Sequence, residues 1–185
     1  MDLALLERIN GLSVHRAALD RLGIFSAKYL ILVFVLALIG LWFTRRRELQ
    51  RAAILASISA LLALGLAQLM GLAYPRPRPY LAHHVHLLIA RTNDTSFPSD
   101  HATFSFAIAV MIWQFNRRLG SVLLVIALWI CWARVFVGAH YPTDVAAGAA
   151  LGSLLSAFMI WLDAHTRLRS LLDQLLSLLA RWRLA

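Results

Sequence analysis

Long runs of apolar residues, each separated from the next by a short polar stretch, dominate the chain. A bilayer core of about 30 Å is crossed by about 20 helical residues, each of which rises 1.5 Å. Five segments reach or approach that length: Leu22–Phe43, Ala52–Tyr74, Ser99–Phe115, Leu119–Val137 and Val145–Leu162. The third is short, and it spans only if its polar beginning belongs to the helix. The pattern predicts five transmembrane helices.

The two ends of the chain carry a different pattern, in which apolar residues recur at helical spacing between polar ones. They are Leu5, Ile9 and Leu12 near the N-terminus, and Leu168, Leu171, Leu172, Leu175, Leu179 and Trp182 near the C-terminus. Both stretches are typical of helices that lie on a membrane surface.

We therefore expect an all-α integral membrane protein, a helical bundle that forms one domain over residues 1–185. Interfacial helices at 1–20 and 166–184 flank a transmembrane bundle at 22–162. If the N-terminal stretch also crosses the membrane, the bundle has six helices instead of five.

Composition supports a membrane protein and excludes several other classes. Of the 185 residues, 61% are hydrophobic and only 15% are charged, whereas a soluble domain has about 25% charged residues. Such a chain is neither a soluble globule, a disordered protein nor a disulfide-stapled secreted scaffold. The net charge of +9 resides in arginines clustered between apolar runs. That placement predicts membrane lipids and an anionic substrate as partners, and no nucleic acid.

The arginine clusters orient the predicted helices, because they follow the first, third and fifth spans. They are Arg45, Arg46, Arg47 and Arg51, then Arg117 and Arg118, then Arg167, Arg169, Arg181 and Arg183. Alternate span ends share a side of the membrane, and the positive-inside rule assigns this side to the cytoplasm. The N-terminus and the polar loop at 74–98 then lie outside.

Three short polar segments fall at or near that outer side. They are Pro75-Arg76-Pro77-Arg78-Pro79-Tyr80, Phe97-Pro98-Ser99-Asp100-His101, and Arg134 with His140 and Asp144. An arginine near a span end is costly without an anion partner or an escape to the interface. Arg134 alone could face lipid headgroups, but three such segments on one side indicate a site.

The residue types in these segments fit phosphate chemistry. Guanidinium groups match phosphate oxygens and stay charged at any working pH. Ser99 follows a proline and precedes an apolar run, so it is a natural N-cap whose helix start offers N–H groups to an anion. Two histidines in such a cradle indicate phosphoryl transfer. Asp144, four residues after His140, could hold one ring N–H, which makes His140 the nucleophile and leaves His101 as the general acid.

These residues resemble the type 2 phosphatidic acid phosphatase superfamily. Its pattern has three blocks: Lys-x6-Arg-Pro, Pro-Ser-Gly-His and Ser-Arg-x5-His-x3-Asp. Here the blocks stand as Arg78-Pro79, Pro98-Ser99-Asp100-His101 and Ala133-Arg134-x5-His140-x3-Asp144. The stretch 77–103, which includes His83-His84-x-His86, is similar to one branch, the bacitracin-resistance type of undecaprenyl-pyrophosphate phosphatases, and this likeness runs over nearly the whole chain.

The resemblance implies an enzyme of the bacterial cytoplasmic membrane that hydrolyses a polyprenyl pyrophosphate to the monophosphate and inorganic phosphate at the outer face. It also implies a phosphohistidine at His140, Arg78, Arg134 and Ser99 as phosphate ligands, and neither a metal nor another cofactor. Two alternatives remain. One is a phosphatase of lipid monophosphates, such as phosphatidylglycerol phosphate or phosphatidic acid. The other is a lipid transporter whose polar residues line a pathway.

The chain departs from the family pattern where the family has a lysine. Counted from Arg78 that lysine would fall at Gly71, and Lys28 is the only lysine present. Arg76 could supply the missing cation as a substrate-binding residue. It could equally face lipid headgroups, because residues two apart in an extended proline-rich run point in different directions.

A second departure puts Asp100 where the family has a glycine. A carboxylate in the first turn of a helix suits the helix dipole. We expect the negative charge of Asp100 to favour the protonated form of His101. The alternative is that this charge repels the anionic substrate. His83, His84 and His86 could bind a metal. Because no carboxylate or cysteine is interleaved, we expect contacts with headgroups or a second phosphate instead.

Overall fold

All regular structure is helical in this computed structural model, which describes residues 1–182, with side chains through Leu179. The helices are α1 (Asp2–Asn10), α2 (Ala17–Tyr29), α3 (Ile31–Phe43), α4 (Arg47–Ala73), α5 (Pro79–Ala82), α6 (Asp100–Phe115), α7 (Arg117–Phe136), α8 (Pro142–His165) and α9 (Leu168–Trp182). The all-α prediction is confirmed. Residues 183 and 184 of the predicted C-terminal helix lie outside the described residues.

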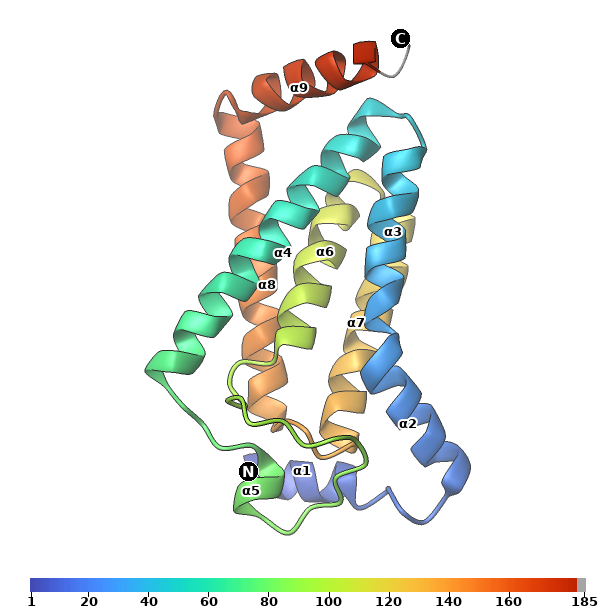
Figure 1. Cartoon of the computed structure of the whole chain (residues 1–185), viewed down its shortest axis with the longest axis vertical. Coiled ribbons are helices and arrows are strands. Elements are labelled where there is room, and N and C mark those ends of the chain that lie inside the picture. Colours follow the sequence, from blue (N-terminus) through green and yellow to red (C-terminus); the bar gives the residue numbers. More distant parts are fainter. Residues whose placement is uncertain (183–185) are drawn as a thin grey trace.

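Helix α6 forms the centre of the bundle. It contacts α3, α4, α7 and α8, and Figure 1 shows it in the middle of these helices. Its Ile108, Met111 and Ile112 have no exposed surface. A helix of 16 residues is only about 24 Å long, so α6 is shorter than its neighbours α4, α7 and α8.

Three described helices, α4, α7 and α8, are long and apolar enough to cross a membrane by themselves. Large apolar side chains such as Leu72, Val125 and Leu154 are more exposed than buried on them, which is expected where the surrounding solvent is lipid. Together with α6 and the pair α2 and α3, they make a five-membered bundle. Counting the pair as one span, up to four of these members in the described part of the chain are long and apolar enough to cross a membrane, and α6, with 16 residues, is not one of them. The chain is a membrane protein.

The first predicted span, Leu22–Phe43, is not one straight helix. It is divided at Leu30 into α2 and α3. Only the two helices together are long and apolar enough to cross a membrane, and their axes are bent by 45° relative to each other. The bend lets α2 pack on α7 while α3 packs on α4. Neither proline nor glycine stands at the break, so the apolar pattern could not reveal it.

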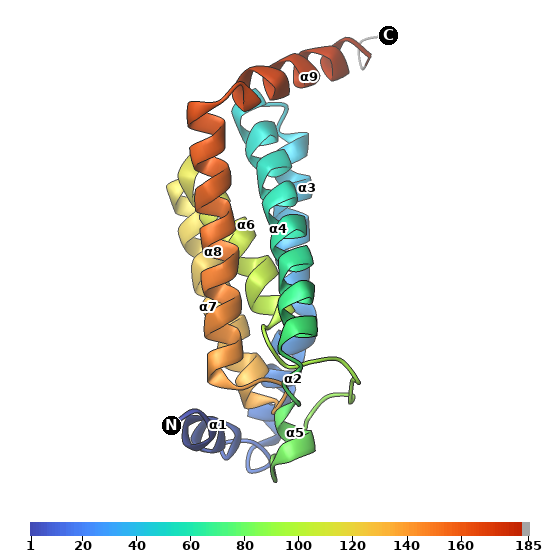
Figure 2. The same cartoon turned by 90° about the vertical axis from the view of Figure 1, so that its left-hand side faces the viewer.

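The two ends of the bundle differ in character. The α3–α4, α6–α7 and α8–α9 turns, which carry the arginine clusters, lie at the end that α9 crosses (Figure 1). The N-terminus, α1, α5 and the loop 83–99 lie at the opposite end, where α1 runs beneath the bundle (Figure 2). With nine residues, α1 is too short to cross a bilayer. The alternative of a sixth span is therefore wrong.

Candidate active site

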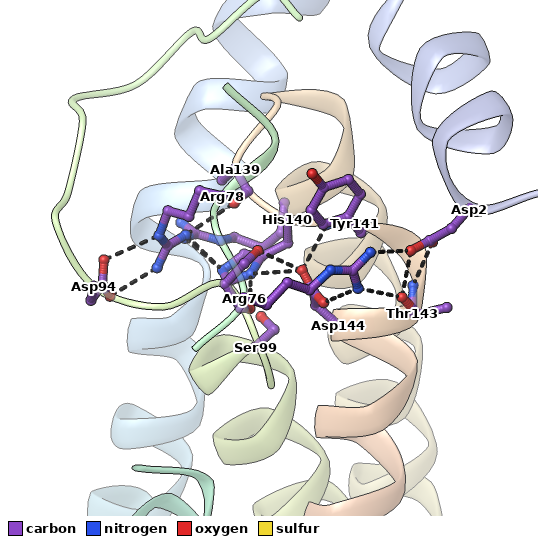
Figure 3. A network of polar contacts seen from close by, with 12 residues as sticks. Asp2, Arg76, Arg78, Asp94, Ser99, Ala139, His140, Tyr141, Thr143 and Asp144 are labelled. Atoms are coloured by element: carbon purple, nitrogen blue, oxygen red, sulfur yellow. Dashed lines mark hydrogen bonds and ion pairs between the residues drawn. The ribbon is translucent and has the colours of Figure 1, made fainter. Parts of the chain in front are cut away.

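A cavity of about 240 Å³ lies at the α1 end of the bundle, many times the roughly 10–15 Å³ that one water molecule requires. The residues predicted for the site that line it are Arg78, Asp100, His101, Arg134 and His140. Ser99 stands between two lining residues, Pro98 and Asp100, whereas Arg76 and Asp144 are not among the lining residues. Segments far apart in the sequence thus meet here (Figure 3).

Arg78 is held on both edges of its guanidinium. Prolines at 77 and 79 keep this stretch extended, and Arg78 is buried at the N-cap of α5. Its Nε and Nη2 donate to the two carboxylate oxygens of Asp94 at 3.1 and 2.8 Å. Its Nη1 donates to the Ala139 carbonyl at 3.0 Å and lies 3.2 Å from His140 Nε2. Asp94 therefore fixes the outer edge of the guanidinium and leaves Nη1 facing the imidazole.

Arg134 lies in the last turn of α7, where a cation suits the helix dipole. Its Nη2 lies 3.2 Å from His140 Nε2, and its Nη1 donates to the Ala27 carbonyl at 3.4 Å. Its buried Nε and the buried hydroxyl of Ser99 have no hydrogen-bond partner within the described residues. Buried donors are rarely left unpaired, so these two are available to an anion in the cavity.

His140 follows a turn that only a glycine adopts without strain. Gly138 has φ +75°, and a Cβ there would lie 2.8 Å from the His86 carbonyl oxygen. The turn places the ring so that Nδ1 lies 2.8 Å from the Ser96 carbonyl oxygen. A carbonyl only accepts, and guanidiniums only donate. Nδ1 therefore carries the proton, and the lone pair of Nε2 points at the two arginines.

The surroundings keep this imidazole neutral. Burial penalises the charged ring, and the positive charges of Arg134 and Arg78 add to that penalty, while Asp144 acts in the opposite direction. The result is a pKa of about 4 for His140, below its ordinary value of 6.5. At neutral pH the ring retains the unprotonated nitrogen that a nucleophile needs.

Asp144 acts on His140 partly through another residue. Its Oδ2 is 3.8 Å from His140 Nδ1, beyond hydrogen-bond range, so the direct bond that the sequence analysis expected is not formed. Instead Oδ2 accepts the Ser96 hydroxyl at 2.5 Å and the Tyr141 N–H at 2.9 Å. The backbone carbonyl of Ser96 in turn accepts a hydrogen bond from the Nδ1–H of His140. The carboxylate thus orients the acceptor of that proton and caps α8.

His101 and Asp100 begin α6 on the cavity wall. Within the described residues no hydrogen bond reaches the His101 ring, so it is free to move a proton to a ligand. The Asp100 carboxylate accepts from Gln68 Nε2 at 3.1 Å to each oxygen. Its partner is therefore an amide of α4, and the expected effect of Asp100 on His101 stays a prediction.

Among the described residues, Arg78 and Arg134 are the only arginines or lysines that line the cavity, so no third one replaces the family lysine there. A side chain at Gly71 would meet Thr95 Oγ1 at 2.6 Å and the Phe97 carbonyl oxygen at 3.2 Å, so the loop closes this position. Arg76 lies beside the cavity with its guanidinium on Asp2 and Asp144, each at 2.6 Å. The sequence offered two roles for Arg76, a phosphate ligand or a contact with lipid headgroups. The structure shows neither contact, because the guanidinium is bound to two carboxylates.

The histidines of the loop serve other contacts. His83 meets the Tyr141 ring edge-on with 5.9 Å between ring centroids, and the backbone of His86 is bound by the amide of Asn10. No group of three His, Cys, Asp or Glu side chains that could hold a metal ion occurs in the described part of the chain.

Sequence reasoning missed several contributors, above all Asp94, Ser96 and Asp2. Asp94 was findable in principle, since it is the one carboxylate in the arginine- and histidine-containing loop 74–98. Ser96 acts mainly through its carbonyl, and Asp2 acts from the far end of the chain. No residue pattern marks either role.

The fold and the cavity define a class of protein: a helical membrane protein that buries an imidazole between two guanidiniums at one end of its bundle. Residues 51–167 match the PAP2 superfamily, and the chain belongs to that superfamily. The resemblance inferred from the three sequence blocks is confirmed.

Relatives of known name match along most of the chain. It is 36% identical over 160 residues to undecaprenyl-diphosphatase BcrC of Bacillus subtilis (strain 168), and the aligned region covers 86% of this chain and 80% of the relative. It is 34% identical over 171 residues to the bacitracin transport permease protein BcrC of Bacillus licheniformis, with 92% and 83% covered.

Two solved structures have a similar fold. LpxE of Aquifex aeolicus has a TM-score of 0.69 at 25% identity, over 86% of this chain and 94% of that one. A transmembrane PAP2 type phosphatidylglycerolphosphate phosphatase from Bacillus subtilis has a TM-score of 0.68 at 20% identity, over 88% and 86%. The second likeness concerns the fold alone.

Proposed function

We propose that this chain is an undecaprenyl-diphosphatase of the bacterial cytoplasmic membrane. It hydrolyses a polyprenyl pyrophosphate to the lipid monophosphate and inorganic phosphate at the outer face. The observation that carries the proposal is the position of His140 Nε2, 3.2 Å from both Arg78 Nη1 and Arg134 Nη2. The names of the relatives, given above, support the choice of substrate.

In the first step the terminal phosphate enters between the two guanidiniums and takes over the donors that face Nε2. The unpaired donors of Ser99 and Arg134 add further bonds to its oxygens. The Nε2 lone pair forms a bond to phosphorus, and the bond from phosphorus to the bridging oxygen breaks. His101 protonates that oxygen as the lipid monophosphate leaves.

In the second step water releases the phosphate. His101, now neutral, takes a proton from the water, whose oxygen bonds to phosphorus as the phosphorus–nitrogen bond breaks. His140 regains its lone pair and keeps its Nδ1 proton on the Ser96 carbonyl. The fixed guanidiniums stabilise the negative charge that builds up on the equatorial oxygens in both steps.

The place of the cavity fits a lipid substrate. It lies at the end of the bundle, so the phosphates can occupy a polar pocket while the polyprenyl tail stays in the lipid around the apolar helices. A phosphatase of lipid monophosphates is the second candidate, supported by 32% identity over 159 residues to the decaprenylphosphoryl-5-phosphoribose phosphatase of Mycobacterium tuberculosis. A transporter would use the same polar residues without chemistry.

The test is phosphate release by purified protein in detergent, with a polyprenyl pyrophosphate, phosphatidic acid and phosphatidylglycerol phosphate side by side. We expect release from the pyrophosphate to exceed that from the other two. His140→Ala should lower kcat at least about 1000-fold, as loss of a nucleophile does, in a protein that still folds. Vanadate, which mimics five-coordinate phosphorus, should inhibit, and a chelator should not.

Each of the other possible results would support a different conclusion. A preference for the monophosphates would select the second candidate, and no release from any lipid would favour the transporter. Retained release in His140→Ala would contradict the phosphohistidine. Strong inhibition by the chelator would restore the alternative of a metal at the loop histidines.

A further inference from the structure

Arg76 is fixed by three groups outside the cavity. Its Nη1 donates to Asp144 Oδ1 and its Nη2 to Asp2 Oδ2, both at 2.6 Å, and its Cζ lies 3.8 Å from the centroid of the Tyr141 ring. Only 22% of the side chain is exposed. A guanidinium engaged on two edges and one face is not available to a phosphate in the cavity (Figure 3).

Asp2 ties the N-terminal helix to this arginine and to the start of α8. Its Oδ1 accepts the Thr143 N–H at 3.0 Å, and its Oδ2 accepts the Thr143 hydroxyl at 2.6 Å as well as Arg76. Burial opposes the ionisation of Asp2, but the hydrogen bonds from Thr143 and Arg76 outweigh it and lower its pKa. Asp2 is therefore an anion at neutral pH.

Two routes connect Arg76 with the nucleophile. The first is the carboxylate of Asp144, which accepts the Ser96 hydroxyl. The second is the backbone, because the Ser96 N–H donates to the Arg76 carbonyl at 2.8 Å. Both routes end on Ser96, whose carbonyl oxygen accepts a hydrogen bond from His140 Nδ1–H at 2.8 Å. A shift of Arg76 would move the group that sets the direction of the imidazole.

The charges of this network suit the intermediate. Asp144 has no exposed surface, and a buried carboxylate needs a cationic partner. If Arg76 served Asp144 alone, the pair would be neutral. Because Asp2 shares Arg76, the three groups sum to one negative charge. When His140 Nε2 gains the phosphoryl group, its ring keeps the Nδ1 proton and becomes positive. The net negative network, with Asp144 Oδ2 3.8 Å from Nδ1, then faces a cation.

We propose that Arg76 and Asp2 are positioning residues for the phosphohistidine step, and that the N-terminal helix α1 is thereby a working part of the active site. The proposal rests on the proposed function. It assigns to Arg76 a role through Asp144 and Ser96 instead of a contact with substrate, and it gives a role to an acid far from the three sequence blocks.

The test compares kcat and KM, with the polyprenyl pyrophosphate, for Asp2→Asn, Asp2→Glu, Arg76→Lys and the control Glu7→Gln. Glu7 is an exposed acid of the same helix α1. Groups that orient a catalytic residue typically contribute about 10- to 100-fold. We expect Asp2→Asn and Arg76→Lys to lower kcat by about that range with KM within about twofold. Asp2→Glu, which keeps the charge, should recover part of the loss, and Glu7→Gln should match the wild type.

The outcomes separate this proposal from the proposed function. Equal kcat in Asp2→Asn and Glu7→Gln, with an active wild type, would overturn the positioning role alone. A raised KM with unchanged kcat in Arg76→Lys would also overturn it, because that split is the mark of a residue that binds substrate. If wild type and Glu7→Gln release phosphate from none of the lipids, both proposals fall.

Discussion

At the scale of single residues, the protein is organised around one neutral imidazole. His140 has the Ser96 carbonyl on Nδ1 and two guanidiniums on Nε2, so its tautomer follows from its partners. The residue types alone predicted a phosphate cradle and a histidine nucleophile. They could not reveal that Ser96 lies between His140 and Asp144, because a backbone carbonyl has no sequence signature.

A direct titration of His140 tests this environment. The pKa of about 4 means that the ring gains a proton, and loses its nucleophilic lone pair, only as the pH falls through that value. In the ligand-free protein we expect its NMR ring signals, identified by their absence in His140→Ala, to shift with a midpoint near pH 4. Above the midpoint the nitrogen shifts should report a proton on Nδ1. A midpoint near the ordinary 6.5 would contradict the buried, arginine-flanked ring.

At the scale of elements, the contact between α6 and α8 places the start of α6 in the site. Two glycines of α8, Gly148 and Gly152, let the helices approach closely. A Cβ on Gly148 would lie 2.5 Å from the Ser99 carbonyl oxygen, and one on Gly152 would lie 2.2 Å from that of Thr103. The backbones of the two helices touch here, next to the residues that begin α6.

Gly152→Ala should therefore destabilise the protein. Its methyl group would collide with backbone, and overpacking of this kind costs about 1–3 kcal/mol, or roughly 2–12 °C in melting temperature for a chain of this size. Gly65→Ala is the matched control, because a Cβ at Gly65 meets nothing within 4 Å and alanine favours a helix. Thermal unfolding in detergent measures both. Equal melting temperatures would mean that the helices are not in contact at Gly152.

At the scale of the whole molecule, the bundle has a basic end and an active end. Arginines gather at the turns near α9, while the cavity, α1 and the loop 83–99 lie at the other end (Figure 1). From this distribution the positive-inside rule predicts that the cavity faces the outer side of the membrane, as the proposed function requires.

Cysteine labelling in intact cells tests this orientation. In a Cys131→Ala background, His83→Cys at the active end should react with a membrane-impermeant maleimide added from outside. Arg167→Cys, equally exposed at the basic end, should react only after the membrane is permeabilised. The reverse pattern would place the cavity in the cytoplasm and contradict hydrolysis at the outer face.

The sequence by itself determined the helices, the membrane as solvent and the kinds of side chain that gather at one end. These follow from local information, since apolar periodicity reports the surroundings of each residue and short motifs report the chemistry. Only the tertiary structure decided the break at Leu30, the closed position at Gly71 and the partners of Arg76. Those features depend on contacts between distant segments, such as the one between Arg76 and Asp2, which are 74 residues apart, and such contacts form only when the chain has folded.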